Sequence, residues 1–468
     1  MTPASPDTVS PAGVVRVVNP ATELTVAEVD RQGKEDADLA VERAARAFPA
    51  WRDVTPADRT RLLRRFAEQV EAHAEELALL ETRNVGKPIA DSRGEVSMVA
   101  DVLHFYAGAV DKHRGATIPV AGGIDVTWPE PLGVVAAIVP WNFPIAIASW
   151  KIGPALACGN TVVVKPAELT PLTALRLAEL ALDAGIPEGV LQVVVGRGTT
   201  VGTVLVEHPD VAKVAFTGST EAGRDVMARA SGTIKRVTLE LGGKSANVIF
   251  ADADLELAAA SAPSAVFGNA GQDCCARSRI LVEQTVFDRF VELLVSATER
   301  LVVGDPEDAA TQMGPLVSAD HRARVTAFVD PADGSLTVAG RSEVPAGPGW
   351  WFPATVLAPV SSDRRVWREE IFGPVVAVTP FKDEAEAVSL ANETPYGLSG
   401  SIWTRDSSRA LRMAKAVQAG VLSVNSNTSV RVNAPFGGMK QSGFGRELGM
   451  EALASFSDLK NVFLSTQG

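Results

Sequence analysis

Residues 134–144 read VVAAIVPWNFP, an unbroken apolar run that ends at proline, tryptophan and asparagine. A short apolar run bounded by turn residues is typical of a strand buried on both faces of a parallel sheet. The layout recurs at 161–164, 191–195 and 211–216, where polar or glycine residues again follow the run. Alanine- and leucine-rich segments, such as 170–184, separate the runs. This alternation predicts an α/β fold with a parallel sheet.

Polar side chains and glycines follow these strands at their carboxyl ends, where open α/β sheets bind ligands. Lys165 and Glu168 follow the second run, and Gly218 and Ser219 follow the fourth. Gly218 frees the backbone to approach a ligand, and a helix that begins near Thr220 offers unpaired N–H groups to a phosphate. Each glycine turn alone is as compatible with a turn that binds nothing. The strand ends together favour a dinucleotide site.

Two of the three cysteines stand side by side in residues 271–276, which read GQDCCA. A small, apolar segment precedes them, and a strand is expected at 279–282. A thiol placed there is a candidate nucleophile, because the thiolate is the reactive form and its surroundings set its pKa. A buried structural cysteine is the alternative, since free cysteine is among the most buried residue types. The residues themselves do not choose between Cys274 and Cys275.

Two further stretches carry carboxylates that can serve such a site. Residues 240–244 read ELGGK and follow an expected strand, so Glu240 can face the same crevice. Residues 369–374 read EEIFGP, and in a strand Glu370 and Phe372 would point to the same side. A surface carboxylate is the competing interpretation for Glu240, and a salt bridge is the competing interpretation for Glu370.

Composition limits the function classes that are open to the chain. A length of 468 residues suggests two or three domains, and the 46% hydrophobic content is typical of a soluble globular protein. The net charge of −12 argues against unaided binding to nucleic acid or an anionic membrane. No apolar run reaches the roughly 20 residues of a membrane span, and residues 1–13 lack the layout of a signal peptide. Three cysteines favour a reducing cytoplasm, and five histidines without a ligand pattern predict no metal site.

The remaining segments are expected to frame the core. Residues 14–30 predict an edge hairpin. A helical period from Leu62 to Leu80 predicts one amphipathic helix, and a second helix is expected from about 94 to 114. Residues 457–464 alternate weakly and predict a strand added to another element or subunit, whereas the Pro- and Gly-rich stretch 345–349 predicts an exposed turn.

Together these stretches resemble the aldehyde dehydrogenase superfamily, over nearly the whole chain from Asn19 to Gly443. The motifs PWNFP, KPAE, FTGST, ELGGK, GQxC and EEIFGPV appear in the family's order. The chain is most similar to the bacterial betaine-aldehyde and aminobutyraldehyde group, in which GQDC also occurs. The stretch at 330–345 looks shorter than usual for the family, which affects a peripheral surface.

The resemblance implies a covalent mechanism. Cys274 would attack the aldehyde carbon as a thiolate, with Cys275 as its neighbour, and a thiohemiacetal and then a thioester would form. The Asn142 amide and the Cys274 backbone N–H would hold the oxyanion. Glu240 would activate the water that hydrolyses the thioester. A CoA-acylating dehydrogenase is one rival, against which Glu240 argues, and a non-enzymatic protein on the same fold is another.

The resemblance also implies NAD as the cofactor and an aldehyde tunnel. An amino- or betaine-type aldehyde is expected, because aromatic faces and nearby carboxylates attract a cationic nitrogen; a broad range of aliphatic and aryl aldehydes is the alternative. The residues implied to hold NAD are Trp141, Lys165, Glu168, Gly218, Ser219, Glu370 and Phe372. Those implied to line the aldehyde tunnel are Phe143, Trp150 and Phe436. Asp273, which adjoins the nucleophile, and Asp101, on the helix near the expected tunnel mouth, are further candidates that could attract a cationic substrate.

The implied architecture has three parts. Residues 1–112 and 133–241 would form a Rossmann-like NAD-binding domain, and residues 242–441 an α/β catalytic domain. Residues 113–132 and 442–468 would form a small bridging element. Members of the family associate through that element, so a homodimer or homotetramer is expected.

Overall fold

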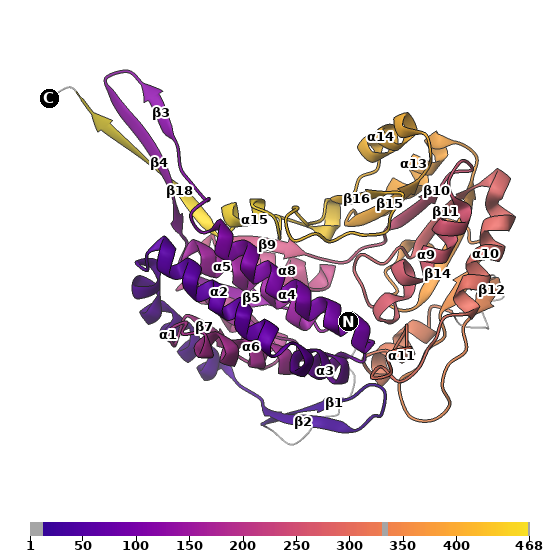
Figure 1. The fold of residues 1–468 in the computed structure, drawn as a ribbon, viewed down its shortest axis with the longest axis horizontal. Helices are drawn as coiled ribbons and strands as arrows, with labels where there is room; N and C mark the ends of the chain where they lie inside the picture. Colours follow the sequence, from indigo (N-terminus) through magenta and orange to yellow (C-terminus); the bar gives the residue numbers. More distant parts are fainter. Residues whose placement is uncertain (1–12, 330–335, 467–468) are drawn as a thin grey trace.

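The computed structural model describes residues 13–329 and 336–466. The predictions for the N-terminal segment and for the shortened stretch at 330–345 therefore fall partly outside the described residues. Figure 1 shows two lobes, one coloured indigo to magenta and one mainly orange, with a narrow extension at one end. Each lobe is built on its own sheet, of six and of seven strands. The predicted α/β class is confirmed.

The six-stranded sheet forms the core of the first lobe. Its strands are parallel except for the short edge strand β17, which runs antiparallel to β9. All four predicted strands belong to this sheet, so the parallel arrangement expected from the apolar runs is confirmed. In sheet order the strands are β17 (Gly443–Phe444), β9 (Arg236–Glu240), β8 (Val211–Thr217), β5 (Val134–Ile138), β6 (Thr161–Lys165) and β7 (Leu191–Val193).

Helices flank this sheet, and two of them differ from the expectation. The single helix expected from Leu62 to Leu80 is divided, because His73 leaves helical geometry (φ −109°, ψ 20°). The helix expected at 94–114 begins earlier, directly after Pro88. The helices are α1 (Lys34–Arg52), α2 (Pro56–Ala72), α3 (Ala74–Val85), α4 (Ile89–Ala109), α5 (Pro144–Cys158), α6 (Leu172–Asp183), η1 (Gly198–Gly202), α7 (Thr203–Glu207), α8 (Thr220–Ala230), η2 (Ser231–Thr233) and α15 (Glu451–Ala454).

The seven-stranded sheet forms the core of the second lobe. In sheet order its strands are β12 (Val338–Arg341), β13 (Thr355–Leu357), β14 (Val375–Phe381), β11 (Arg279–Glu283), β10 (Ala246–Ile249), β15 (Ser399–Trp403) and β16 (Val421–Val424). Its helices are α9 (Leu255–Phe267), η3 (Gly268–Gly271), η4 (Gln284–Val286), α10 (Phe287–Glu299), α11 (Ala319–Thr326), α12 (Arg365–Arg368), α13 (Glu384–Asn392), α14 (Ser407–Ala416) and η5 (Lys440–Ser442).

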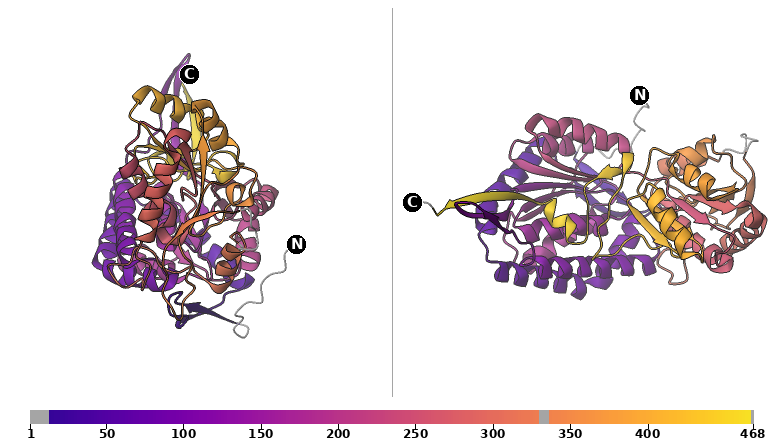
Figure 2. Two further views of the ribbon diagram at one scale, coloured as in Figure 1. Left: turned by 90° about the vertical axis from the view of Figure 1, so that its right-hand side faces the viewer. Right: turned by 90° about the horizontal axis from the view of Figure 1, so that it is seen from above.

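Two small antiparallel sheets lie outside the lobes. The expected hairpin is formed by β1 (Val14–Val18) and β2 (Thr25–Asp30). The C-terminal strand β18 (Ser457–Ser465) pairs along its whole length with β4 (Gly123–Pro131), which also pairs with β3 (Thr117–Val120). The tail is therefore a strand, as predicted, and its partner is in the same chain. Figures 1 and 2 show this three-stranded sheet projecting away from both lobes.

Candidate functional site

A cavity of about 320 Å³ lies where residues of both lobes meet. Helices α4 and α5 provide one side of it, and the loop that carries the paired cysteines provides another. Its lining consists of Glu95, Met98, Phe143, Ala146, Ile147, Trp150, Thr217, Glu240, Ser264, Ala265, Asp273, Cys274, Cys275, Arg277, Asn427, Thr428, Ser429, Val430, Phe436 and Glu447.

The cysteines lie on a sharply bent loop between α9 and β11. Asn269 and Ala270 both have left-handed backbones, with φ of 50° and 56°. Gly271 follows with φ of 69°, and a Cβ there would lie 2.3 Å from the carbonyl oxygen of Gly373. Only glycine fits this close approach. The loop is thereby held against residue 373, and its next residues are turned toward the cavity.

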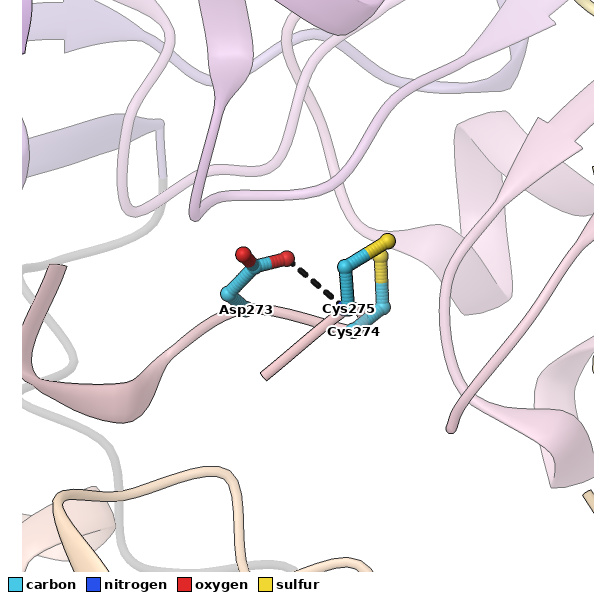
Figure 3. Close-up of side chains that lie close together, drawn as sticks. All are labelled: Asp273, Cys274 and Cys275. Carbon is cyan, nitrogen blue, oxygen red and sulfur yellow. Dashed lines mark hydrogen bonds between the residues drawn. The ribbon is translucent and has the colours of Figure 1, made fainter. Parts of the chain in front are cut away.

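Both thiols line the cavity, and they differ in exposure. Cys274 is half-buried, whereas Cys275 is buried. Figure 3 shows their sulfur atoms beside each other, with Asp273 accepting a hydrogen bond from the Cys275 backbone N–H at 2.8 Å. The hydrogen bond with Cys275 and burial raise the pKa of the Cys274 thiol well above its usual value. A carboxylate oxygen of Asp273 and the sulfur atoms of Cys274 and Cys275 lie within 4.8 Å of one another.

Asn142 is placed beside the nucleophile loop by a chain of amide hydrogen bonds. Its Nδ2 donates to the Gln272 carbonyl at 2.9 Å, and Asn269 Nδ2 donates to the Asn142 carbonyl at the same distance. The Gln272 side chain in turn bonds the Asn269 carbonyl and the Val317 N–H. The Asn142 amide, the expected oxyanion donor, is therefore buried and fixed against Gln272, which precedes Cys274 by two residues.

Glu240 is the last residue of β9 and faces the cavity. It is buried, and among the residues that the structure describes neither carboxylate oxygen has a hydrogen-bond partner. Burial, with the nearby charge of Glu447 second, raises the pKa of Glu240 well above its usual value, while Lys151 acts in the opposite direction. A buried carboxylate with a raised pKa is suited to holding and releasing a proton.

Lys151 and Glu447 form a buried ion pair beside Glu240 that sequence reasoning missed. Lys151 Nζ contacts Glu447 Oε1 and also donates to Thr217 Oγ1 at 2.8 Å. The one available signal was a lysine in the middle of α5, whose other side chains are almost all apolar. Glu447 is held by reciprocal backbone hydrogen bonds with Phe436, a residue of the cavity wall.

The carboxyl group that α4 contributes to the cavity lining is Glu95. Asp101, expected on the same helix near the tunnel mouth, is exposed and does not line the cavity, whereas Glu95 and Met98 do. At about 100° per residue, the six-residue step from Glu95 to Asp101 rotates the side chain onto another face of the helix. Sequence reasoning chose this helix and missed Glu95; that Asp101 acts on a substrate stays a prediction.

Glu95 is held by a buried lysine. Lys87 Nζ donates to the two Glu95 oxygens at 2.7 and 2.6 Å, and it lies 3.4 Å from Glu81 Oε1. The same ammonium lies 4.4 Å from the centroid of the Phe143 ring. Burial raises the pKa of Glu95 to about 8, although the charge of Lys87 opposes that shift.

The three aromatic residues expected around the aldehyde all reach the cavity. Phe143, Trp150 and Phe436 line it, and the last two rings meet edge to face with centroids 5.2 Å apart. Asp273 lines it as well. That these side chains contact a substrate remains a prediction.

Four of the residues expected to hold NAD, Lys165, Glu168, Gly218 and Ser219, lie at or beyond the carboxyl ends of β6 and β8, on either side of β5. Lys165 Nζ donates to the Pro166 carbonyl at 2.8 Å, and burial lowers the pKa of Lys165 to about 8. Glu168 accepts from Arg31 Nε at 2.8 Å, a partner that sequence reasoning missed. Ser219 caps α8 by accepting from the Ala222 N–H at 3.2 Å.

Close approach explains the glycine at 218. A Cβ there would lie 2.6 Å from the Phe216 ring. The bare backbone beside the first turn of α8 and the spare donors of Lys165 fit a pyrophosphate and a ribose. These features are compatible with a bound dinucleotide.

Glu370 and Phe372 do not lie in a strand, the setting in which their side chains would point to the same side. They lie in an irregular segment between α12 and β14, and Phe372 has a left-handed backbone with φ of 58°. Glu370 Oε1 accepts from the Gly243 N–H at 2.8 Å, and burial raises the pKa of Glu370 to about 7. The Phe372 ring packs edge-on against Trp141, with centroids 5.3 Å apart. The backbone reversal, not strand alternation, orients these two side chains.

Comparison with known proteins gives concordant results. The family model described as "Aldehyde dehydrogenase family" matches residues 8–462. A phenylacetaldehyde dehydrogenase of Pseudomonas fluorescens is 45% identical over 96% of this chain and 92% of its own length. A betaine aldehyde dehydrogenase of Bacillus subtilis is 41% identical over 96% of this chain and 94% of its own length.

Solved structures agree with the sequence comparisons. PnpE from Pseudomonas sp. WBC-3, in complex with nicotinamide adenine dinucleotide, superposes with a TM-score of 0.95 at 43% identity, covering 97% of this chain and 95% of that one. A betaine aldehyde dehydrogenase of Staphylococcus aureus in complex with NAD+ gives 0.95 at 38% identity, over 97% and 92% of the two chains. Among the helices of the described residues, none is long and apolar enough to cross a membrane.

Proposed function

Because the chain belongs to the aldehyde dehydrogenase family, we propose that it oxidises an aldehyde to the carboxylate with NAD, through a thioester on Cys274. The substrate class that we propose is an aldehyde with a distant cationic nitrogen, of the amino or betaine type. The observation that carries this choice is the Glu95 carboxyl group on the wall of a cavity to which Phe143, Trp150 and Phe436 contribute aromatic rings.

In the proposed mechanism, Cys274 attacks the carbonyl carbon and its own backbone N–H and the Asn142 amide stabilise the oxyanion. Asn142 is suited to this because one Nδ2 proton is already directed to the loop at Gln272 and the other remains free. NAD would supply the hydride acceptor when bound, and a thioester would remain on Cys274. Glu240 then takes a proton from the attacking water and releases the acid.

The raised pKa values of Cys274 and Glu240 determine which proton transfer must precede the attack on the aldehyde. The Cys274 thiol is protonated at neutral pH, so it must lose a proton before it attacks. Glu240 shares the cavity with it and, once ionised, can accept that proton; it passes the proton on to solvent before it takes another from the attacking water. The positive charge of Lys151 favours the ionised form of Glu240 against the effect of burial.

The groups that would hold NAD are those at the strand ends. Lys165 and Glu168 would bind the adenosine ribose, and Gly218 with Ser219 the pyrophosphate. Glu370 would bind the nicotinamide ribose, and Trp141 and Phe372 would flank the nicotinamide ring. The NAD complexes of the structural relatives support this choice of cofactor.

The cavity wall supports a cationic substrate. The faces of Phe143, Trp150 and Phe436 attract an ammonium group by about 0.5–2 kcal/mol. Glu95 and Asp273 add negative charge to the same lining once they are ionised; burial raises the pKa of both carboxyl groups, that of Glu95 to about 8. A second candidate is a broad preference for aliphatic and aryl aldehydes, which the apolar side chains of Met98 and other lining residues and the phenylacetaldehyde dehydrogenase relative favour.

One assay separates these possibilities. NADH formation is measured with betaine aldehyde, 4-aminobutanal, phenylacetaldehyde and hexanal, each with and without CoA. We expect the two cationic aldehydes to give the higher kcat/KM and CoA to have no effect. A clear preference for the neutral aldehydes would refute the cationic substrate, and dependence on CoA would refute hydrolysis by Glu240.

We further propose that the chain acts as a homodimer or homotetramer in the cytoplasm. The projecting sheet of β3, β4 and β18 exposes Trp128, Leu459 and Phe463, which suit an interface with a second copy. Sedimentation equilibrium of the wild type and of Leu459→Asp tests this. A monomeric wild type would contradict it.

A further inference from the structure

Arg277 follows the nucleophile by three residues and has no role in the mechanism above. Its side chain is 1% exposed, and it lines the cavity. Burial of a guanidinium is costly unless its N–H donors are satisfied. Within the described residues, the hydrogen bonds of Arg277 go to neutral oxygen atoms and not to a carboxylate. The property of Arg277 that matters at this position is therefore its set of guanidinium N–H donors, which can bind several acceptors at once.

These acceptors come from three separate parts of the fold. NH1 donates to the Cys275 carbonyl at 2.5 Å, within the nucleophile loop. Nε donates to Ser401 Oγ on β15 at 2.8 Å. NH2 donates to Ser429 Oγ at 2.8 Å and reaches the Asn427 carbonyl at 3.4 Å. One side chain thus joins the nucleophile loop to a strand and to a distant loop.

The distant loop forms one wall of the cavity. Residues 427–430, here called the 427–430 wall, all line it and belong to no helix or strand. Within the described residues, two other hydrogen bonds join this wall to distant segments: Asn427 Nδ2 donates to Ser261 Oγ at 3.1 Å, and Ser429 Oγ lies 3.0 Å from Ser399 Oγ. Thr428 makes local hydrogen bonds with Ser423 and Ser426, and Val430 packs against the core of the first lobe. An irregular segment holds its position through side-chain contacts of this kind.

The neighbouring arginine shows what a purely structural role looks like. Arg279 is equally buried, but its guanidinium bonds the carbonyls of Lys244, Leu390 and Ala391. None of these residues lines the cavity that holds Cys274. Of these two buried arginines, only Arg277 is therefore connected to the 427–430 wall.

We infer that Arg277 is a positioning residue that sets substrate selectivity by fastening the 427–430 wall to the nucleophile loop. This inference rests on the proposed use of the cavity as the aldehyde site. Long or bulky aldehydes reach the wall and depend on its position, whereas acetaldehyde needs only the groups around Cys274. Removal of the Arg277 donors should therefore change the relative KM values of different aldehydes without changing kcat for the smallest one.

The kinetic test compares Arg277→Met, which keeps the length of the side chain and removes its donors, with the wild type. We expect KM for phenylacetaldehyde to change by about 10-fold, the effect of losing one or two hydrogen bonds to a charged group. For acetaldehyde, kcat and KM should stay within about 2-fold. Arg277→Lys keeps the charge without the fork and should resemble Arg277→Met. An equal loss of kcat for both aldehydes would overturn the inference.

Hydrogen exchange of the substrate-free protein provides an independent readout. Amides of residues 426–432 should exchange faster in Arg277→Met, while those of β10 and β11 stay protected. Unchanged exchange at 426–432 in a folded variant would overturn the inference. This readout does not depend on the proposed function, because it applies even if the protein oxidises no aldehyde. Should Arg277→Met not fold, Ser429→Ala decides, because it removes one acceptor from the wall and leaves the buried charge in place; it should show the same changes, smaller in size.

Discussion

Replacement of Glu95 by glutamine is expected to weaken binding of cationic aldehydes and to leave neutral ones almost unchanged. Glu95 is the carboxylate that α4 places on the cavity wall, and glutamine keeps its size while removing its charge. Two unit charges about 5 Å apart interact by about 3 kcal/mol at an effective dielectric constant of about 20. Lys87 contacts both Glu95 oxygens and offsets part of this. Where Glu95 is ionised, a net loss of about 1.4 kcal/mol corresponds to a 10-fold rise in KM.

The pH dependence sharpens this prediction. Burial raises the pKa of Glu95 to about 8, so the carboxyl group becomes fully charged only as the pH rises through that value. The quaternary ammonium of betaine aldehyde has no titratable proton. Its KM should therefore fall between pH 7 and 9 in the wild type, and this fall should be absent in Glu95→Gln. Steady-state kinetics with betaine aldehyde and phenylacetaldehyde at several pH values measure both effects.

Glu81 supplies the matched control. It contacts the same lysine and is equally buried, but it does not line the cavity. Glu81→Gln should therefore leave the difference between cationic and neutral aldehydes intact. If Glu81→Gln and Glu95→Gln raised KM alike, the effect would come from disturbed packing around Lys87. If Glu95→Gln affected both aldehydes equally, the cationic substrate class would lose its structural basis.

Three further predictions follow from the site. Cys274→Ser should abolish aldehyde oxidation and Cys275→Ser should retain most of it in the NADH assay; the reverse result would exchange their roles. Glu240→Gln should stall after acylation, so that mass spectrometry finds an acyl group on the Cys274 peptide, and full steady-state turnover in this variant would remove Glu240 as the base. Wild-type kcat/KM should be higher with NAD than with NADP, and Glu168→Gln, which frees Arg31 from its ion pair, should improve NADP use by about 10-fold; equal efficiency of the wild type with both cofactors would contradict this.

Features that depend on local sequence were predictable. The apolar runs at 134–139 and 211–216 became β5 and β8, because a strand buried on both faces must be apolar throughout. The cysteine loop was found because its glycine, amide and thiol are adjacent in the sequence. The division of one expected helix at His73 was not predictable, since the helical period of apolar residues continues across it.

Features that depend on distant partners were not predictable. Glu95 and Asp101 are both acidic residues on one helix, and only the packing of α4 decides which of them faces the cavity. Arg31 and Glu168 lie 137 residues apart, and Lys151 and Glu447 lie 296 residues apart. No spacing rule connects such pairs. The left-handed backbone at Phe372 is likewise imposed by surrounding structure, because a bulky residue disfavours it.

Among the carboxyl groups that line the cavity, Glu240 differs in that neither of its oxygens has a hydrogen-bond partner within the described residues. Lys87 compensates Glu95, and Lys151 compensates Glu447, as the cost of burying a charge requires. Glu240 lies in the same cavity with neither oxygen bonded. A carboxylate that served stability alone would be paired, because an unpaired one raises the free energy of the folded state. An unpaired carboxylate beside a thiol is, however, free to accept a proton from water. This arrangement sacrifices stability at the one position where the proposed hydrolysis needs a base.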